Sequence, residues 1–456
     1  MNAGLVVDAP AGPISGGVDG RVRRFLGVPY AEAPVGPLRF AAPRPRAAFT
    51  APFEATRHGA TPQRVPLFAT TTIPEPSIPG DDTLNLDIFA PEECAGAPIL
   101  FWIHGGGYIA GSPASPWYDG SAFAREGVIV VVPSYRLGLD GFGVIPGCPD
   151  NRGLLDLIAA LRWVRENAEA FGGDPRRVTI AGQSAGGGAV LALLASPTAE
   201  GLFRAAVSVS GIDVSFDRTE ARSATAAIAR ELGVEPTAEG FGPRDDGEAM
   251  RAILRLRDAE TSSAALAFGP VHGDDVLPEP IPVALRHRGA GVPLLAGATA
   301  DEFDGGPTPE DPGRPDASSP EAVAAKAAGT RATDILFRAS CVRTAAARAG
   351  GPGGTWLYSF DWPSPVTGAA THCIDVPFLF GNLGADGVTA ALGSAPPPSL
   401  QSAMHGDVLA VVRGTEPAWP RARGAANDAT RVYSADGESA VGYGSFDPCL
   451  HLADRP

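Results

Sequence analysis

The stretch Arg177–Val190, RVTIAGQSAGGGAV, decides how this chain folds. It begins as an apolar run over Val178–Ala181, passes through GQSAG at 182–186, and continues in alanine and leucine to about Leu194. This order predicts a strand, a sharp turn and a helix, with Ser184 at the tip of the turn. The glycines on either side are needed because side chains there would collide with neighbouring backbone. A glycine-rich turn with a surface serine is the simpler alternative, but the strand–helix context favours a nucleophile beside the helix amides.

Other short apolar runs, bounded by glycine or proline, predict further buried strands at Ile99–Ile103, Val128–Val132, Ala205–Val209 and Pro293–Ala296. Their continuous rather than alternating hydrophobicity fits a parallel sheet covered on both faces. Between two of these runs, Asn151–Phe171 has apolar side chains at helical spacing, with Asn151 expected as the N-cap and Gly172 as the stop. Strands that alternate with helices indicate an α/β fold.

Two stretches depart from this alternation. Residues 212–290 have mostly helical patterns, including 223–232 and 248–257, and residues 304–320 are acidic and rich in turn-forming residues. We therefore expect a single domain over residues 1–456, with helical insertions at 212–290 and 304–350 above the sheet and a mobile loop at 304–320.

The run Ile99–Ile103 leads directly into His104-Gly105-Gly106-Gly107-Tyr108. Three glycines after a buried strand leave N–H groups free to converge on one point, which acyl transfer requires because negative charge builds on the carbonyl oxygen. Such an HGGG loop is the expected partner of a G-x-S-x-G turn. The simpler alternative is a flexible glycine loop without a catalytic role. We expect His104 to hold this loop rather than to act as a base.

Composition excludes several classes of protein. The net charge is −15, from 36 basic and 51 acidic residues, and a chain that binds nucleic acid needs a basic face instead. The five cysteines are scattered without a CxxC pair, which indicates neither a disulfide framework nor a zinc site. No apolar run approaches the roughly 18 residues of a membrane span, and Met1–Pro10 does not resemble a signal peptide. We expect a cytoplasmic protein without metal, cofactor, membrane or nucleic-acid partner.

Taken in order, the motifs resemble those of the type-B carboxylesterases, the cholinesterase and carboxylesterase branch of the α/β-hydrolases. Besides the two glycine loops, the similar segments are FLGVPYAEAPVGPLRF (25–40), DDTLNLDIF (81–89), SYRLG (134–138), NRGLLD (151–156), FGGDP (171–175) and SVSG (208–211). The similarity fades between about 212 and 290 and after about 385. The resemblance implies an α/β-hydrolase fold, in which helices flank a mostly parallel central sheet.

The chain also departs from the family pattern. Thr83 stands where the family has a cysteine, so the usual N-terminal disulfide cannot form, which agrees with a reducing compartment. Ser134 stands where asparagine is usual. By the same resemblance, Arg39 and Asp81 are expected to form a structural ion pair.

A nucleophilic serine needs a base, and the base needs a carboxylate to orient it. In α/β-hydrolases these follow the serine in the order acid, then histidine. His372 resembles the family's histidine loop, and His405 is the next candidate. Asp301 and Glu302 follow a predicted strand. The family uses the glutamate of this pair, so the resemblance implies Glu302, with Asp301 as the alternative.

The resemblance further implies an oxyanion hole formed by the amides of Gly106, Gly107 and Ala185, and a hydrogen bond to the triad from Ser210. Cys373 follows the base directly, and an exposed thiol there would make activity sensitive to alkylation. Asp301, Asp304 and Asp375 can otherwise be read as solvated or loop-bracing carboxylates. Four aromatic residues near the catalytic loops are candidates either to line the substrate pocket or to pack beneath the loops: Tyr108, Trp117, Tyr118 and Phe303.

The function implied is that of a serine carboxylesterase, which hydrolyses small-molecule carboxylic esters through an acyl-enzyme on Ser184. An amidase, a carbamate hydrolase or a lactonase would use the same machinery. A non-catalytic cholinesterase-like binding protein is the alternative of another class, but such relatives usually lose a member of the triad. The sequence indicates neither the natural substrate nor the oligomeric state.

Overall fold

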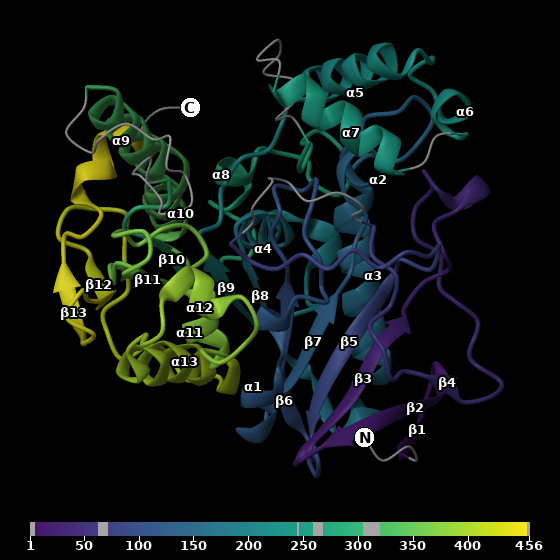
Figure 1. Ribbon diagram of the computed structural model, residues 1–456, viewed down its shortest axis with the longest axis horizontal. Helices are drawn as coiled ribbons and strands as arrows, with labels where there is room; N and C mark the ends of the chain where they lie inside the picture. Colours follow the sequence, from purple (N-terminus) through teal and green to yellow (C-terminus); the bar gives the residue numbers. More distant parts are fainter. Residues whose placement is uncertain (1–4, 63–71, 244–245, 259–267, 304–319, 454–456) are drawn as a thin grey trace.

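A computed structural model describes residues 5–62, 72–243, 246–258, 268–303 and 320–453 (Figure 1). A 13-stranded sheet runs through the described chain. Its strands are β1 (Leu5–Ala9), β2 (Gly12–Asp19), β3 (Val22–Pro29), β4 (Phe53–Glu54), β5 (Asn85–Pro91), β6 (Ala97–Ile103), β7 (Ile129–Pro133), β8 (Gly173–Gln183), β9 (Ala205–Val209), β10 (Leu294–Thr299), β11 (Thr355–Phe360), β12 (Ala429–Tyr433) and β13 (Ser439–Tyr443).

The strands lie in the order β1-β2-β3-β5-β7-β6-β8-β9-β10-β11-β12-β13, and β4 pairs with β2. Every neighbouring pair from β7 to β12 is parallel, whereas the pairs from β1 to β7 in this order and the pair β12–β13 are antiparallel, and β4 pairs parallel with β2. The predicted α/β-hydrolase architecture, with its mostly parallel central sheet, is confirmed. All five predicted apolar runs lie in or overlap strands of this parallel part.

The burial of strand β6 on both faces explains why its sequence is apolar without interruption. Successive side chains of a strand point to opposite faces of the sheet. In β6, Ile99, Phe101 and Ile103 enter one hydrophobic core, while Leu100 and Trp102 enter another. All five residues are fully buried, so both faces of this strand are covered.

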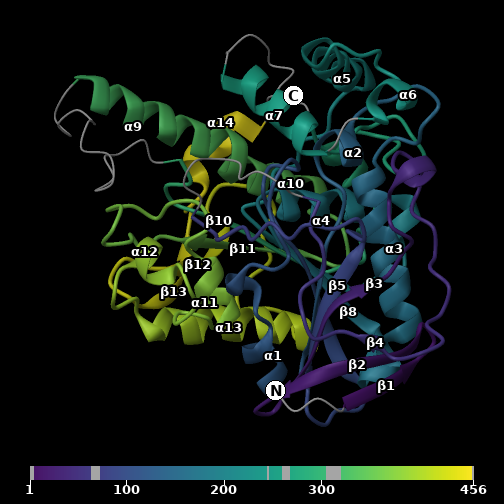
Figure 2. The same cartoon turned by 45° about the vertical axis from the view of Figure 1, so that its right-hand side comes forward.

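The helices that cover the sheet form two layers (Figures 1 and 2). One layer packs against the core that contains Ile99, and it consists of α3 (Arg152–Asn167), α4 (Ala185–Ala195), α8 (Ile281–Ala284) and α10 (Ala339–Arg348). The other packs against the core that contains Trp102, and it consists of α1 (Ser121–Arg125), α11 (Val376–Phe380) and α13 (Pro398–Arg413). The sheet is therefore the middle layer of three.

Helix α3 begins where the sequence predicts, but it ends at Asn167 and a 3-10 turn over Ala168–Phe171 continues to Gly172, and Asn151, the residue before the helix, acts differently from its expected role. Asn151 has left-handed backbone (φ 53°), and its side chain does not cap the helix. Instead the side-chain amide pairs with the backbone of Val271, donating to the carbonyl at 2.7 Å and accepting from the N–H at 2.8 Å. The predicted N-cap bond is therefore wrong, because this side chain ties α3 to a distant loop. Gly172, with φ 85°, ends the following 3-10 turn as expected.

The stretch 212–290, predicted to be mostly helical, contains α5 (Arg218–Leu232), α6 (Ala238–Phe241), α7 (Asp246–Asp258) and α8. Figure 1 shows α5, α6 and α7 gathered beyond one end of the sheet, at the upper right. Later in the chain, α9 (Pro320–Ala332), a π-helical turn (Thr333–Arg338) and α10 form one continuous helical segment. Of the loop expected to be mobile at 304–320, residues 304–319 lie outside the described residues.

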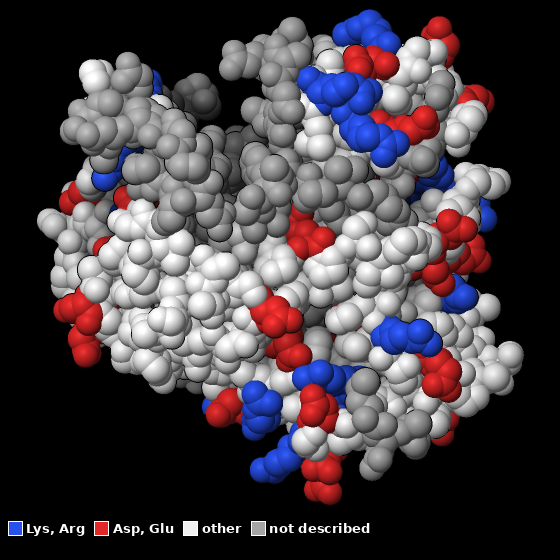
Figure 3. Space-filling view, viewed as in Figure 1, with Lys and Arg blue, Asp and Glu red and all other residues white. Residues whose placement is uncertain are grey.

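None of the described helices is long and apolar enough to cross a membrane. On the face shown in Figure 3, acidic and basic side chains are interspersed around α5 and α7, and a broad uncharged area lies over the lower left. The negative net charge is therefore not gathered into one acidic region on this face.

Two arginines fix the chain near the start of α3. The guanidinium of Arg136 forms two hydrogen bonds with the carboxylate of Asp156, at 2.7 and 2.8 Å, and both side chains are almost fully buried. Arg39 pairs with Asp140, also through two hydrogen bonds, at 2.8 and 3.0 Å. The expected partner of Arg39 was Asp81. That expectation is wrong, because Asp81 is exposed whereas Asp140 in α2 (Gly138–Phe142) lies against the guanidinium.

We predict that Asp156→Asn lowers the free energy of unfolding by about 3–5 kcal/mol, because it leaves the buried Arg136 charge without a counter-ion. Urea unfolding followed by tryptophan fluorescence would measure this change. The matched control is Asp174→Asn, which removes a partner of the largely exposed Arg176 and should barely move the midpoint. Equal effects of the two substitutions would contradict the prediction.

Candidate active site

The turn between β8 and α4 places Ser184 in a conformation that few residues with a side chain adopt. Its φ is 58° and its ψ is −122°. Two backbone hydrogen bonds hold it there: its N–H donates to Val209 O at 2.8 Å, and its carbonyl accepts from Gly188 N at 2.9 Å. A Cβ at Gly182 would lie 2.5 Å from backbone atoms of Gly186, and one at Gly186 would lie 2.0 Å from Ile103 O. Both glycines are therefore required for the turn to form.

The glycine loop after β6 lies directly beside this turn. Gly106 and Gly107 have positive φ, of 111° and 61°. Within the described chain, the backbone N–H groups of Gly106, Gly107 and Ala185 donate to no acceptor. Three unpaired donors next to a nucleophile are what an oxyanion hole needs.

His104 braces this loop, as the sequence predicts. Its ring is fully buried, stacks on Tyr135 with the centroids 4.6 Å apart, and has Nδ1 2.8 Å from Gly105 O. Burial lowers the pKa of His104 to about 4, so the ring is neutral at physiological pH. The Tyr135 hydroxyl donates to the His104 carbonyl at 3.0 Å and fixes the loop from the other side.

The loops after β10 and β11 bring Glu302 and His372 together. His372 Nδ1 is hydrogen-bonded to Glu302 Oε2, and the backbone N–H of His372 donates to Glu302 O at 3.0 Å. The other carboxylate oxygen of Glu302 accepts the N–H of Thr299 at 2.8 Å. The glutamate is almost fully buried, so its charge is matched by donors rather than by water.

The alternative acid and base lie in other surroundings. Asp301 braces the histidine loop, since its N–H donates to Ala370 O at 3.0 Å and its Oδ2 accepts from Ala370 N at 3.1 Å. His405 lies in α13, where Nδ1 is 2.8 Å from Leu379 O and the ring packs on Phe123 at 4.2 Å. Neither residue is joined to the Glu302–His372 pair by a hydrogen bond in the described part of the chain.

The electrostatics of His372 set its readiness to act as a base. Burial lowers the pKa of the imidazole, but the neighbouring Cys373 and Glu302 raise it, and the pKa lies well above its ordinary value. Ring contacts with Phe337 at 5.0 Å and Phe303 at 5.9 Å cover its other side.

Ser184 and His372 line one cavity of about 140 Å³. Its wall also contains two of the glycines expected to form the oxyanion hole, and one of the four candidate aromatic residues. The full lining is Thr72, Ile73, Glu75, Gly105, Gly106, Gly107, Gly111, Ser112, Tyr118, Gln183, Ser184, His372 and Cys373.

The other three aromatic candidates lie outside this lining. Trp117 is fully buried and donates from Nε1 to Asp386 O at 3.0 Å. Tyr108 packs its ring on Phe142 at 4.9 Å. Phe303 is 43% exposed, and its ring contacts that of Phe337 at 5.3 Å. Trp117 therefore packs beneath the loops, whereas Tyr108 is half-buried against Phe142.

Three other residues near the triad differ from their expected roles. Ser210 Oγ is buried and has no hydrogen-bond partner among the described residues, so the expected hydrogen bond to Glu302 or His372 is not formed, and the backbone N–H of Ser210, at φ 49°, donates to Gly297 O. Cys373 lines the cavity but is 9% exposed, so it is a buried thiol rather than an exposed one. Asp375 is fully buried, and its Oδ2 accepts from Tyr358 Oη at 3.1 Å, so it is not solvated. Burial and the nearby Glu302 raise the pKa of Asp375 to about 7.

Sequence reasoning missed Phe337, Gln183 and Glu75. Phe337 reaches His372 through the π-helical turn, which no local pattern signals. Gln183 occupies the unspecified position between the glycine and the serine of the G-x-S-x-G turn, where the motif carries no signal. Glu75 lies in a segment without a motif.

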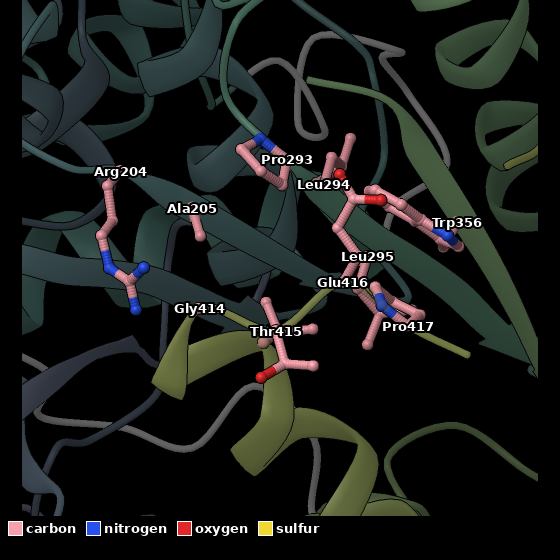
Figure 4. A pocket seen from close by; sticks show the side chains of 11 residues that line it. Arg204, Ala205, Pro293, Leu294, Leu295, Trp356, Gly414, Thr415, Glu416 and Pro417 are labelled. Carbon is pink, nitrogen blue, oxygen red and sulfur yellow. The ribbon is translucent and has the colours of Figure 1, made fainter. Parts of the chain in front are cut away.

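A second hollow lies at the opposite edge of the sheet, where β9, β10 and β11 begin (Figure 4). Its walls include Leu294, Leu295 and Trp356, with Arg204 at the side away from the tryptophan. Neither Ser184 nor His372 lines this second hollow. Within the described residues, no three His, Cys, Asp or Glu side chains gather as a metal site would require.

A mostly parallel sheet with a serine at a strand–helix turn defines the chain as an α/β-hydrolase. A sequence profile of the carboxylesterase family matches residues 3–308. The chain therefore belongs to the carboxylesterase family, and the resemblance inferred from its motifs is confirmed.

Known relatives agree with this assignment. The chain is 36% identical over 411 residues to the para-nitrobenzyl esterase of Bacillus subtilis (strain 168), covering 83% of each sequence. It is 33% identical to the phenmedipham hydrolase of Pseudarthrobacter oxydans, again over 83% of each. A solved PNB esterase structure superposes with a TM-score of 0.86 and 30% identity, covering 99% of both chains. The structure of the Geobacillus stearothermophilus carboxylesterase EST55 at pH 6.2 superposes with a TM-score of 0.82 and 32% identity, covering 98% of this chain and 100% of the EST55 chain. The protein is thus a carboxylic ester hydrolase.

We predict that Glu302→Gln lowers kcat by roughly 10³–10⁴-fold, because the neutral amide no longer fixes the tautomer and charge of His372. It should also move the acid limb of kcat/KM to lower pH, since the carboxylate raises the pKa of the imidazole. A pH series with a chromogenic ester measures both effects. Asp301→Asn is the matched control and should lose less than about tenfold. A larger loss in the control would make Asp301 the acid.

Proposed function

We propose that Ser184, His372 and Glu302 hydrolyse carboxylic esters through an acyl-enzyme. The observation that carries this proposal is that one cavity holds Ser184 and His372, while Glu302 is hydrogen-bonded to the imidazole nitrogen on the far side. The order serine, acid, histidine along the chain supports it.

In the first step, His372 Nε2 takes the proton of Ser184 Oγ while the oxygen attacks the ester carbonyl. The C–O bond to the alcohol then breaks, and the imidazolium gives its proton to the leaving oxygen. Water repeats the cycle on the acyl-enzyme, with His372 again as base, and the carboxylic acid leaves. Glu302 keeps Nδ1 protonated throughout and stabilises the transient positive charge.

The amides of Gly106, Gly107 and Ala185 are proposed to hold the oxyanion of each tetrahedral intermediate. Their lack of other acceptors in the described chain supports this role. The start of α4 adds the partial positive charge of a helix N-terminus on the same side. Each such donor is typically worth about 3–4 kcal/mol in the transition state.

The substrate is proposed to be a small ester, including nitroaromatic esters such as those named for the Bacillus relative. The modest volume of the cavity and the aromatic ring of Tyr118 in its wall support this choice. Amides, carbamates and lactones remain chemically possible alternatives for the same triad. A purely binding function is disfavoured because the serine, histidine and glutamate are all present.

The enzyme is further proposed to act in the cytoplasm, without a membrane or nucleic-acid partner. All five cysteines are free thiols, as expected in a reducing compartment. The net charge of −15 opposes binding to phosphate backbones.

We predict that p-nitrophenyl acetate gives a rapid burst of about one equivalent of p-nitrophenol per chain when deacylation is the slower step. Ser184→Ala should abolish the burst, lower turnover by roughly 10⁴-fold or more, and prevent labelling by a fluorophosphonate. Ser402→Ala, at an exposed serine of α13, should behave as the parent enzyme does. Full activity or labelling in Ser184→Ala would refute the assignment of the nucleophile.

A further inference from the structure

Gln183, the residue before the nucleophile, has a side chain that reaches the base. The residue is 1% exposed and lies between the turn and the histidine loop. Its Nε2 is 3.1 Å from His372 Nε2 and 3.1 Å from Cys373 Sγ. One amide group therefore contacts two neighbouring residues of another loop.

The tautomer of His372 decides the direction of these contacts. Nδ1 faces the carboxylate of Glu302, so in the neutral form of the ring, which is the form that can act as a base, Nδ1 carries the proton and Nε2 is an acceptor. A side-chain NH₂ group has two N–H donors. One donates to the imidazole nitrogen and the other to the thiol sulfur of Cys373.

Nε2 is also the atom that has to accept the proton of the nucleophile. In the described chain, no hydrogen bond joins Ser184 Oγ to His372, and the lone pair of Nε2 faces the amide instead. In the structure without substrate, the amide therefore occupies the position on the base that the serine hydroxyl needs.

We propose that Gln183 is a positioning residue, which is anchored on the Cys373 thiol, donates to Nε2 of the neutral imidazole and so opposes its protonation, and releases Nε2 to Ser184 when an ester binds. This inference rests on the proposed catalytic roles of Ser184 and His372. It assigns a use to a side chain that takes no part in the bond-forming steps.

The chemistry makes this arrangement selective for one charge state. After His372 takes up a proton, Nε2–H and the amide N–H would both be donors, and the contact would become unfavourable. The amide then has to move away or turn its oxygen toward the ring, and either movement breaks the bond to Cys373. Cys373 therefore sets how firmly Gln183 favours the neutral imidazole.

The other titratable groups near His372 are Cys373, Glu302 and Asp375. The Cys373 thiol interacts with both the imidazole and the Gln183 amide, Glu302 binds Nδ1, and the carboxylate of Asp375 interacts electrostatically with Glu302 and His372. From the π-helical turn, only the ring of Phe337 meets the imidazole. The charged residues of the turn face elsewhere: Asp334 accepts from Cys449, and Arg338 donates to Ser359. Tyr118 and Glu75 line the same cavity as His372.

The test is the pH dependence of kcat/KM for a p-nitrophenyl ester, and of the rate of fluorophosphonate labelling, in the full-length enzyme. Gln183→Glu replaces the donor with a carboxylate beside Nε2, which favours the imidazolium. The acid limb should move up by about one pH unit or more, so that activity falls roughly tenfold at acid pH and little at alkaline pH.

Gln183→Met keeps the length of the side chain but has no N–H donor, and it is the gentler variant. It should shift the acid limb in the same direction by a smaller amount, because Nε2 of the neutral ring loses its hydrogen-bond donor. Gln401→Met, in α13 and outside the cavity lining, is the matched control and should leave the acid limb in place.

Thermal unfolding of each variant would show whether it is folded, and if Gln183→Glu is not, Gln183→Met decides the question. An equal loss of activity at every pH, or a limb that stays in place, would overturn the inference. Absence of labelling in the parent enzyme would instead overturn the proposed nucleophile. The two failures are therefore distinguishable.

Discussion

The strained backbone at Ser184 is the constraint on which the rest of the site depends. A residue with a side chain is held at φ 58° only because β8, β9 and α4 supply hydrogen bonds and close packing around it. The glycines at 182 and 186 leave room for β6 and its loop to approach within van der Waals contact. Because the sheet is buried on both faces, the two cores keep these strands in register. The fold thus maintains the strained conformation of Ser184, and this conformation places the serine hydroxyl at the cavity.

Glu302 and His372, the proposed acid and base, lie in loops far along the chain, and the parallel order of β8, β9, β10 and β11 brings them to the same edge of the sheet. Asp301 fastens one loop to the other through the backbone of Ala370. Glu302 can then remain buried because the donors around its carboxylate take the place of water. The same burial places Asp375 close to it, where two carboxylates compete for negative charge.

Features that depend on local sequence could be predicted. Uninterrupted apolar runs indicated the parallel strands, and the two glycine motifs indicated the turn and the loop. Features that depend on distant contacts could not. Arg39 is near Asp140 rather than Asp81 only in the folded chain, and Asn151 leaves its capping role for a loop more than a hundred residues away. Phe337 reaches the histidine because a π-helical turn changes which side chains face inward, and apolar spacing carries no sign of that.

A catalytic histidine in a buried site has to be neutral in order to accept the proton of serine, and its cation has to be stabilised until the proton passes to the leaving group. Glu302 favours the cation, whereas burial opposes it. The carboxylate of Glu302 raises the pKa of the imidazole, and a ring that is already protonated cannot accept the proton of serine. A neutral amide that donates to Nε2 opposes that tendency without adding charge to the cavity, and a carboxylate at position 183 would do the reverse. On this proposal, the identity of residue 183 adjusts the charge balance of the site beside Ser184, the proposed nucleophile.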